Sequence, residues 1–357
     1  MNILLSSAGR RNYLVRYFKD ALQGHGRVLA ADASGDAPAL HEADVPLVVP
    51  PFSDESYVPT VIGICRKHDI ELVLPLNDFE LPVMARAAER LLREARARVI
   101  VSTPAVIDTC LDKLATQKFL QQQGIFVPKT YSNLASASAA LAQGELSFPV
   151  IIKPRWGSGS AGLFCADTPS ELETAVNWCR RAIRASSVLA YTAGQDGDNE
   201  VLIQEKLFGA EYAFDVVNDL SGRYACTLSR LKLTAWGGEA DRAVTVRNPN
   251  VEELGRHIGA ALGHVGVLDC DAIQTDRGWA ILDLNPRFGG AYPFSHAAGA
   301  DIPAAILAWA RHEQPAASCF RYTPGILTTK TLAIVTSAIP QQQYAFDPVK
   351  ACGLVEA

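Results

Sequence analysis

The segment Ala280–Gly290, AILDLNPRFGG, decides the fold prediction. Three apolar residues lead into Asp283, and polar and apolar residues then alternate up to Asn285. Because side chains in a strand repeat every two residues, Asp283 and Asn285 share one face of the strand. Pro286 then ends the strand, and the pair Gly289–Gly290 lets the chain turn. The segment therefore predicts two oxygen-bearing side chains gathered at one strand end.

The chemistry of these side chains suits phosphate. A carboxylate and an amide oxygen are ligands for Mg²⁺, which takes few protein ligands and completes its shell with phosphate oxygens. Arg287 follows Asn285 by two positions, and a guanidinium suits a phosphoryl group in transfer. The pattern predicts a site for a divalent metal, Mg²⁺ or Mn²⁺, beside a phosphate.

A second carboxylate, Asp271, lies upstream in the run LDCDAIQ. The segment Asp276–Gly278 reads as a hairpin turn, which would bring Asp271 next to Asp283 as a further oxygen ligand. The alternative is that both carboxylates are strand-edge charges that face water. The apolar residues around them favour burial, and a buried charge needs a partner or a metal.

Size and composition limit the classes of function. A chain of 357 residues suggests two or three domains, and a net charge of −5 argues against a nucleic-acid partner. The eight cysteines form no Cys-x-x-Cys pair, a pattern expected of reduced thiols in the cytoplasm rather than of disulfides or zinc. The sequence shows no signal-peptide order at its start and no apolar run of membrane-spanning length. We therefore expect a cytoplasmic protein with no membrane partner.

The first hundred residues have the outline of a dinucleotide-binding fold. A strand at Asn2–Ser6, a turn at Gly9, a helix at Tyr13–Leu22 and a second strand ending at Asp32 follow in that order. Only one glycine stands where the fingerprint has three, so nicotinamide binding is the weaker alternative. We expect a Rossmann-like domain whose first turn faces a substrate or only packs. Further strands are expected at 45–49, 72–75 and 99–102, with helices at 57–68 and 82–95.

Polar residues follow the strand at 72–75. Asp78 and Glu80 stand at the carboxyl edge of the predicted sheet, where open α/β sheets bind ligands. They are candidates for substrate contact, or else caps of the next helix.

The strand 148–154 ends in Lys153 and leads into a loop rich in glycine and serine. The loop residues are Gly157, Ser158, Gly159, Ser160 and Gly162. Such a loop beside a lysine can cradle phosphates through backbone N–H groups and an ammonium, although a plain turn is the alternative. Lys113 lies near a helix start, where the helix dipole favours anions, which indicates that it serves a ligand.

The second half of the chain is richer in strands. The segment 186–199 is polar and glycine-rich and predicts a mobile loop or a domain edge. Arg230, Lys232 and Arg242 lie in the charged segment 229–246. They could grip a charged substrate, and a solvated hairpin is an equal alternative. Helices are expected at 251–262 and 302–310.

In this order the motifs resemble the ATP-grasp superfamily. The likeness is to one unit of the carbamoyl-phosphate synthase large chain, to biotin carboxylase and to the pyrrolysine-pathway ligase type, and it extends from residue 1 to about 310. Its specific part is the succession of Asp112–Lys113, Ile152–Pro154 with the glycine loop, Gln204–Leu207, Glu211, Asp271 and Asp283–Arg287.

The resemblance implies a role for each matching position. Lys113 and Lys153 would contact ATP phosphates beneath a flap formed by Gly157–Gly162. Asp271, Asp283 and Asn285 would bind two Mg²⁺ ions, at positions where the family usually has glutamate in place of the two aspartates. The remaining roles would be adenine binding by Glu205, Lys206 and Leu207, ribose binding by Glu211, and stabilisation of the transferred phosphoryl group by Arg287.

The resemblance also implies the architecture, an α/β ATP-grasp fold. A Rossmann-like pre-ATP-grasp domain would span residues 1–110. A lid subdomain with the flap would follow at 111–200 and a subdomain with the metal site at 201–320, which leaves 321–357 unassigned.

The function implied is that of an ATP-dependent carboxylate–amine ligase. Such an enzyme forms an amide or peptide-like bond through an acyl phosphate and releases ADP and phosphate. The short stretch after Arg287 favours a free-standing single unit acting on a small-molecule carboxylate and amine. Dimers are common in the family, so a homodimer is a possible assembly. The alternatives are a carbamoyl-phosphate-synthase-like enzyme that forms a carboxylate phosphate, a non-catalytic nucleotide-binding protein and, last, an oxidoreductase.

Overall fold

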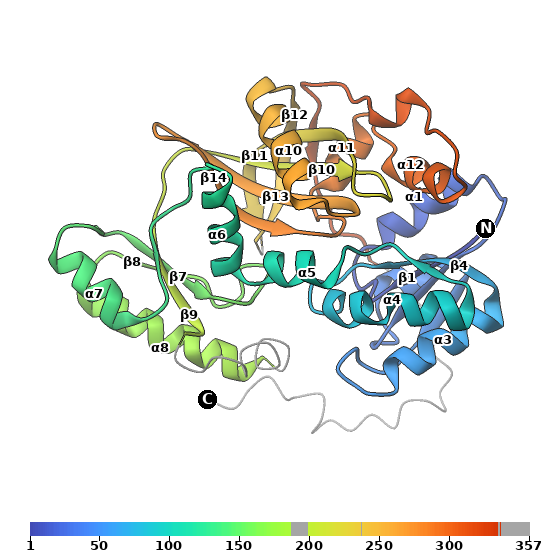
Figure 1. Ribbon diagram of the computed structural model, residues 1–357, viewed down its shortest axis with the longest axis horizontal. Helices are drawn as coiled ribbons and strands as arrows, with labels where there is room; N and C mark the ends of the chain where they lie inside the picture. Colours follow the sequence, from blue (N-terminus) through green and yellow to red (C-terminus); the bar gives the residue numbers. More distant parts are fainter. Residues whose placement is uncertain (187–198, 237, 335, 337–357) are drawn as a thin grey trace.

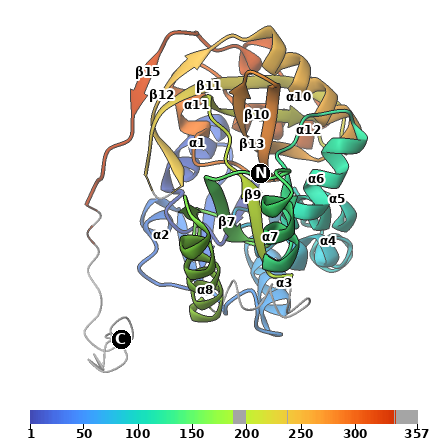
Figure 2. The same ribbon diagram turned by 90° about the vertical axis from the view of Figure 1, so that its left-hand side faces the viewer.

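Three β-sheets organise the chain in the computed structural model, which describes residues 1–186, 199–236, 238–334 and 336. A five-stranded parallel sheet contains the N-terminal strands, a four-stranded antiparallel sheet the middle of the chain, and a six-stranded antiparallel sheet the C-terminal strands. Figures 1 and 2 show the C-terminal sheet above the other two.

The N-terminal sheet has helices on both faces, as the sequence predicts for a Rossmann-like fold. Its order is β3–β2–β1–β4–β5, with bounds β1 Asn2–Ser6, β2 Val28–Asp32, β3 Val45–Val48, β4 Ile70–Pro75 and β5 Arg98–Val99. Ile3 and Leu5 face α1 (Asn12–Leu22) and α2 (Pro38–Glu42), whereas Leu4 faces α3 (Tyr57–His68) and α4 (Leu81–Ala95). Burial on both faces is why β1 is continuously apolar.

The four-stranded sheet has the order β6–β9–β7–β8. The strands are β6 Thr130–Tyr131, β7 Val150–Pro154, β8 Phe164–Ala166 and β9 Val201–Glu205. Small and apolar residues of α7 (Leu134–Ala142) and α8 (Pro169–Ala185) cover one face of this sheet. Most of the predicted loop 186–199 lies outside the described residues.

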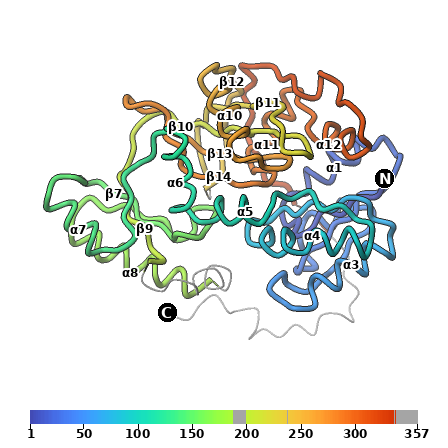
Figure 3. The backbone as a smooth tube through the Cα atoms, in the orientation of Figure 1, coloured from blue at the N-terminus to red at the C-terminus, as the bar shows by residue number. Residues whose placement is uncertain are grey.

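Two further helices, α5 (Pro104–Leu111) and α6 (Lys113–Gln122), connect the N-terminal sheet to this sheet and lie against β14 (Gly278–Asn285), as Figure 3 traces. Asp112 caps α6, since its side chain accepts a hydrogen bond from Leu114 N at 2.9 Å. Lys113 is thereby held at the helix start, next to the end of β14.

The C-terminal sheet has the order β14–β13–β10–β11–β12–β15. The remaining strands are β10 Ala210–Asn218, β11 Tyr224–Trp236, β12 Glu239–Val246, β13 Gly266–Thr275 and β15 Leu327–Thr329, and the helices are α10 Pro249–Leu262, α11 Tyr292–Ala297 and α12 Ile302–Ala310. The predicted hairpin is confirmed, because β13 pairs with β14 in antiparallel register. Asp271 stands opposite Asp283, and Asp269 stands opposite Asn285.

Polar contacts and the packing of α12 on α1 join the N-terminal and C-terminal sheets. Val265 N donates to Ser102 Oγ at 2.9 Å, and Arg98 Nη2 donates to Leu220 O at 2.8 Å. Tyr13 OH donates to Gly289 O at 3.5 Å. The carboxyl edge of the Rossmann-like sheet is therefore fixed against the end of β14. No helix in the described ranges combines the length and apolar character that crossing a membrane requires.

Candidate active site

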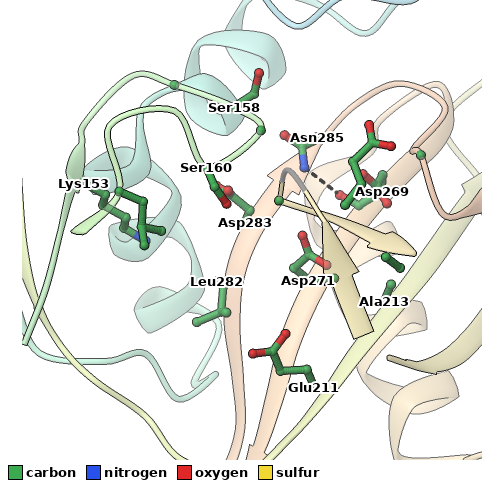
Figure 4. A pocket seen from close by; sticks show the side chains of 18 of the residues that line it. Lys153, Ser158, Ser160, Glu211, Ala213, Asp269, Asp271, Leu282, Asp283 and Asn285 are labelled. Carbon is green, nitrogen blue, oxygen red and sulfur yellow. Dashed lines mark hydrogen bonds between the residues drawn. The ribbon is translucent and has the colours of Figure 1, made fainter. Parts of the chain in front are cut away.

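A cavity of about 520 Å³ lies where the glycine loop, the C-terminal sheet and the edge of the N-terminal sheet meet (Figure 4). It gathers most of the residues singled out in the sequence. These are Asp78, Lys113, Lys153, Gly157, Ser158, Gly159, Ser160, Glu205, Lys206, Leu207, Glu211, Lys232, Asp271, Asp283, Asn285 and Arg287.

The two opposed carboxylates of β13 and β14 each hold a lysine. Lys113 Nζ lies 2.8 Å from Asp283 Oδ1 and also donates to Gly157 O at 2.8 Å. Lys232 forms an ion pair with Asp271. Burial raises the pKa of Asp271 to about 6, although the Lys232 ammonium acts against the rise. Two carboxylates at this point are thus stable only with cations beside them.

The donor set fits a magnesium ion. Asn285 Nδ2 donates to Asp269 O at 3.4 Å, the dashed line in Figure 4, which leaves its amide oxygen available beside Asp283. In the described part of the chain, no cluster of three or more His, Cys, Asp or Glu side chains is arranged to hold a metal. Two carboxylates and one amide oxygen are the sparse protein ligand set that Mg²⁺ accepts when phosphate oxygens complete its shell.

Lys153 at the end of β7 is buried in the cavity wall with no hydrogen bond or ion pair to its side chain from the described residues. Burial lowers the pKa of Lys153 to about 8; Asp283 opposes this shift and Lys113 adds to it. An ammonium that is largely desolvated and has no partner among the described residues is costly, so the position suits an anion.

The glycine loop closes over the cavity from one side. Gly159 and Ser160 have positive φ angles of 63° and 57°. A Cβ on Gly238, at the turn between β11 and β12, would lie only 2.7 Å from Gly159 C and 2.6 Å from Ser160 Oγ. The loop and the β11–β12 turn therefore touch, and only a glycine fits between them. Gly162 does not line the cavity; its Cα faces Pro154 and Ala182.

Arg287 bridges two carboxylates at the opposite side of the cavity. Nη2 donates to Asp78 Oδ2 at 2.9 Å and Nη1 donates to Asp269 Oδ2 at 2.8 Å. Burial alone would lower the pKa of Arg287, but the two carboxylates raise it above its ordinary value. Burial would likewise raise the pKa of Asp78, and Arg287 holds it below its usual range. The guanidinium is charged and fixed in place.

Three residues predicted to contact substrate do not reach the cavity, and those predictions are corrected. Glu80 is buried below the sheet edge and accepts hydrogen bonds from Ser6 Oγ, at 2.6 Å, and from Tyr57 OH. Arg230 is fully buried and pairs with Asp215 and with Ser295 Oγ. Arg242 is exposed on β12, away from the cavity. Apolar strands around Glu80 and Arg230 hide them from any ligand.

Two charged lining residues, Asp269 and Arg11, were missed in the sequence. Asp269 precedes Asp271 by two positions, so strand periodicity alone could have placed it on the same face. Arg11 follows the first strand of the parallel sheet, at the edge where ligands bind. Glu239 belongs to the charged segment 229–246 that was expected to grip a substrate, and it lines the cavity at the start of β12.

Comparison with known families agrees with this geometry. The family model of the PylC-like N-terminal domain matches residues 3–100, and that of the ATP-grasp domain matches residues 146–232. A third, described as ATP-grasp in the biosynthetic pathway with Ter operon, matches residues 198–329.

Curated relatives are distant and longer. The D-alanine--D-alanine ligase of Marinomonas sp. (strain MWYL1) is 29% identical over 120 residues, 34% of this chain and 33% of that protein. The carbamoyl phosphate synthase large chain of Pasteurella multocida (strain Pm70) is 23% identical over 262 residues, 67% of this chain and 23% of that protein. The chain thus spans a third or less of the length of these relatives.

Solved structures share the fold. Biotin carboxylase from Campylobacter jejuni superposes with a TM-score of 0.68 at 17% identity, over 90% of this chain and 73% of that one. The L-amino acid ligase from Bacillus licheniformis gives 0.65 at 20% identity, over 86% and 74%.

With this fold, this cavity and these matches, the chain combines a PylC-like N-terminal domain, residues 3–100, with ATP-grasp domain matches over residues 146–329.

Proposed function

We propose that the chain is a cytoplasmic ATP-dependent carboxylate–amine ligase, which forms an amide or peptide-like bond and releases ADP and phosphate. One observation carries the proposal: the opposed carboxylates Asp271 and Asp283, the unpaired Lys153 and the fixed Arg287 line one cavity. A protein that only binds a nucleotide has no use for a guanidinium held at the point of phosphoryl transfer.

ATP enters as a substrate at the glycine-loop side of the cavity. Lys153 and Lys113 meet its phosphates, with the loop above them. Adenine lies at the end of β9, along Glu205, Lys206 and Leu207, and Glu211 on β10 holds the ribose. We also propose the division of the chain at about residues 110, 200 and 320.

Asp271, Asp283 and Asn285 would hold Mg²⁺, with Mn²⁺ as a substitute. A bound divalent ion would cancel charge on the phosphates and help to align them. Lys113 and Lys232 occupy the carboxylates in the absence of a ligand, which lowers the cost of burying them. If the carboxylates held a metal, the same lysines would be free to turn to phosphate oxygens.

The reaction needs alignment more than covalent help. An oxygen of the carboxylate substrate takes the γ-phosphoryl group, ADP leaves, and Arg287 offsets the charge on the group in transit. The amine nitrogen then forms a bond to the acyl carbon as the bond between that carbon and the phosphate oxygen breaks. Phosphate departs with the electron pair, and the proton that the nitrogen loses passes to the departing phosphate. The contact between the glycine loop and the turn at Gly238 keeps water from the acyl phosphate.

The match to carbamoyl phosphate synthase large chains favours one second candidate, a bicarbonate-activating enzyme that forms a carboxylate phosphate. A screen of ADP release separates the possibilities. The purified chain with Mg²⁺ and ATP is offered a panel of carboxylates crossed with a panel of amines, and bicarbonate with and without ammonia. Ligase function predicts release that needs Mg²⁺, one acid and one amine together.

Release with bicarbonate alone would favour the second candidate. Binding of ATP without cleavage by any pair would leave only a nucleotide-binding protein. We also propose that the active form is a homodimer. Light scattering of the purified chain measures the mass of the assembly.

A further inference from the structure

Basic side chains of the cavity divide into paired and unpaired groups. The six that line it are Arg11, Lys113, Lys153, Lys206, Lys232 and Arg287. Four of them have a partner: Asp283 for Lys113, Asp271 for Lys232, Asp78 and Asp269 for Arg287, and Cys165 Sγ for Lys206. Across the described residues, no hydrogen bond or ion pair involves the side chains of Lys153 and Arg11.

The two unpaired cations serve different parts of the cavity. Lys153 is held beside Asp283 and Lys113, where the phosphates of ATP are proposed to bind. Arg11 belongs to the turn between β1 and α1, and the carboxylates that feel its charge are Asp78 and Glu239. The proposed nucleotide accounts for Lys153, and Arg11 is left to bind a second ligand.

The surroundings of the Arg11 side chain favour binding of an anion over contact with solvent. Its Nε atom is buried and has no hydrogen-bond acceptor among the described residues, a state that costs free energy until an acceptor arrives. A guanidinium presents its N–H groups as a planar fork that matches a carboxylate. Arg10, its neighbour in the same turn, is exposed and lines no part of the cavity.

The surrounding charges suit a ligand that carries both signs. Asp78 and Asp269 are already paired with Arg287, so Arg11 and Glu239 are the charges at this end of the cavity that a second ligand can meet. A carboxylate on Arg11 and an ammonium near Glu239 would match them. Glu239 is half exposed and pairs with Lys330, so one side of its carboxylate is open to a ligand.

We propose that Arg11 binds the carboxylate of the amine substrate, which is therefore an amino acid whose carboxylate is not activated. This inference rests on the proposed ligase function. The carboxylate that takes the phosphoryl group must lie near Asp283 and Asn285, and Arg11 acts elsewhere. Arg11 is a specificity-determining residue that selects amines bearing an acid group.

The test offers the full-length chain, with Mg²⁺ and ATP, each of the twenty L-amino acids and the matching carboxamides as the amine, crossed with the carboxylate panel. We expect kcat/KM for the best amino acid to exceed that for its carboxamide about 10- to 100-fold, the effect of one charge-assisted pair. Arg11→Gln should bring the ratio close to one by raising KM for the amino acid, and Arg11→Lys should restore part of it. Arg10→Gln removes a charge from the same turn and should keep the wild-type ratio.

A wild-type chain that treats the two amines alike, or an Arg11→Gln variant that keeps the preference, would overturn the inference. The inference would also be overturned if Arg11→Gln abolished a preference for dicarboxylic over monocarboxylic acids in the acid panel and left the preference among amines unchanged. If no pair releases ADP, the ligase proposal fails, and binding then decides the role of Arg11. The role would be supported if an amino acid raised the Tm of the wild-type chain more than its carboxamide did, and if Arg11→Gln lost this difference. The role would be rejected if none of the twenty amino acids raised the Tm of the wild-type chain.

Discussion

Arg287 holds Asp78 at an N–O distance of 2.8 Å, although the two residues lie 209 positions apart in the chain. The ion pair joins the carboxyl edge of the Rossmann-like sheet to the end of β14. One guanidinium therefore closes the interface between the two sheets and faces the proposed phosphoryl group. Its substitution should affect both stability and turnover.

Arg287→Lys tests the catalytic part of this role, because it keeps a positive charge between Asp78 and Asp269. Loss of the planar fork should lower kcat about 100-fold or more, as for other groups that stabilise a transition state. The affinity for ATP should change only a few-fold. Steady-state kinetics and calorimetric ATP binding measure the two effects, and equal losses in both would contradict a transition-state role. Arg287→Ala should in addition destabilise the fold by about 3–5 kcal/mol, because it leaves two buried carboxylates unpaired.

Asp283→Asn should weaken the response to Mg²⁺ and the activity together. The substitution removes one of two opposed carboxylates and the partner of Lys113. We expect the Mg²⁺ concentration for half-maximal ADP release to rise about 10- to 100-fold. Asp276→Asn, at the exposed turn of the same hairpin, is the matched control and should behave as wild type. Unchanged activity of Asp283→Asn at limiting Mg²⁺ would remove this carboxylate from the site.

Glu80 makes stability depend on pH. Burial raises its pKa to about 7, so the folded chain holds this proton more tightly than the unfolded chain does. Its contribution to stability is complete below about pH 4.5, the ordinary glutamate value, and is lost as the pH rises through 7. Glu80→Gln keeps an acceptor for Ser6 and Tyr57 without the charge. The unfolding free energy of this variant relative to wild type should therefore increase by about 2–3 kcal/mol between pH 5 and pH 8.

Urea denaturation at both pH values measures that difference. Glu89→Gln, an exposed position on the neighbouring helix α4, should show no change with pH relative to wild type. A flat difference for Glu80→Gln would mean that Glu80 is charged in the folded chain throughout this range.

Gly238→Ala should disturb the cover of the cavity. The new Cβ would lie 2.7 Å from Gly159 C, so the glycine loop must move away. We expect KM for ATP to rise about 10-fold, the scale of an overpacked contact. Gly263→Ala has a similar positive φ with nothing within 4 Å of the added Cβ, and it controls for backbone strain. An equal effect of the two substitutions would show that the contact with the loop has no importance for ATP.

Periodicity and turn chemistry predicted much of this fold. The helices at 57–68 and 302–310 have the predicted bounds, and the hairpin that pairs Asp271 with Asp283 is present. These features depend on residues close in sequence. Helix α8 was not predicted, and neither was the place of Arg230, whose buried pairing with Asp215 depends on neighbouring strands rather than on its own segment.

The same limit applies to the site. One short segment at a strand end contains Asp283, Asn285 and Arg287, so the sequence alone predicts that they lie together. Asp78 contacts Arg287 only because two sheets pack against each other. A charged residue has no sequence signal that tells a ligand contact from a buried ion pair. Glu80 and Asp78 are two positions apart, yet only Asp78 lines the cavity.

A crystal structure of the chain with Mg²⁺ and a non-hydrolysable ATP analogue tests the central claim most directly. We predict at least one Mg²⁺ bound by Asp271, Asp283 and Asn285 with metal–oxygen distances of about 2.0–2.1 Å, beneath the terminal phosphates and beside Lys153. Side chains of these three residues directed away from the triphosphate, with their lysine partners still in place, would contradict it.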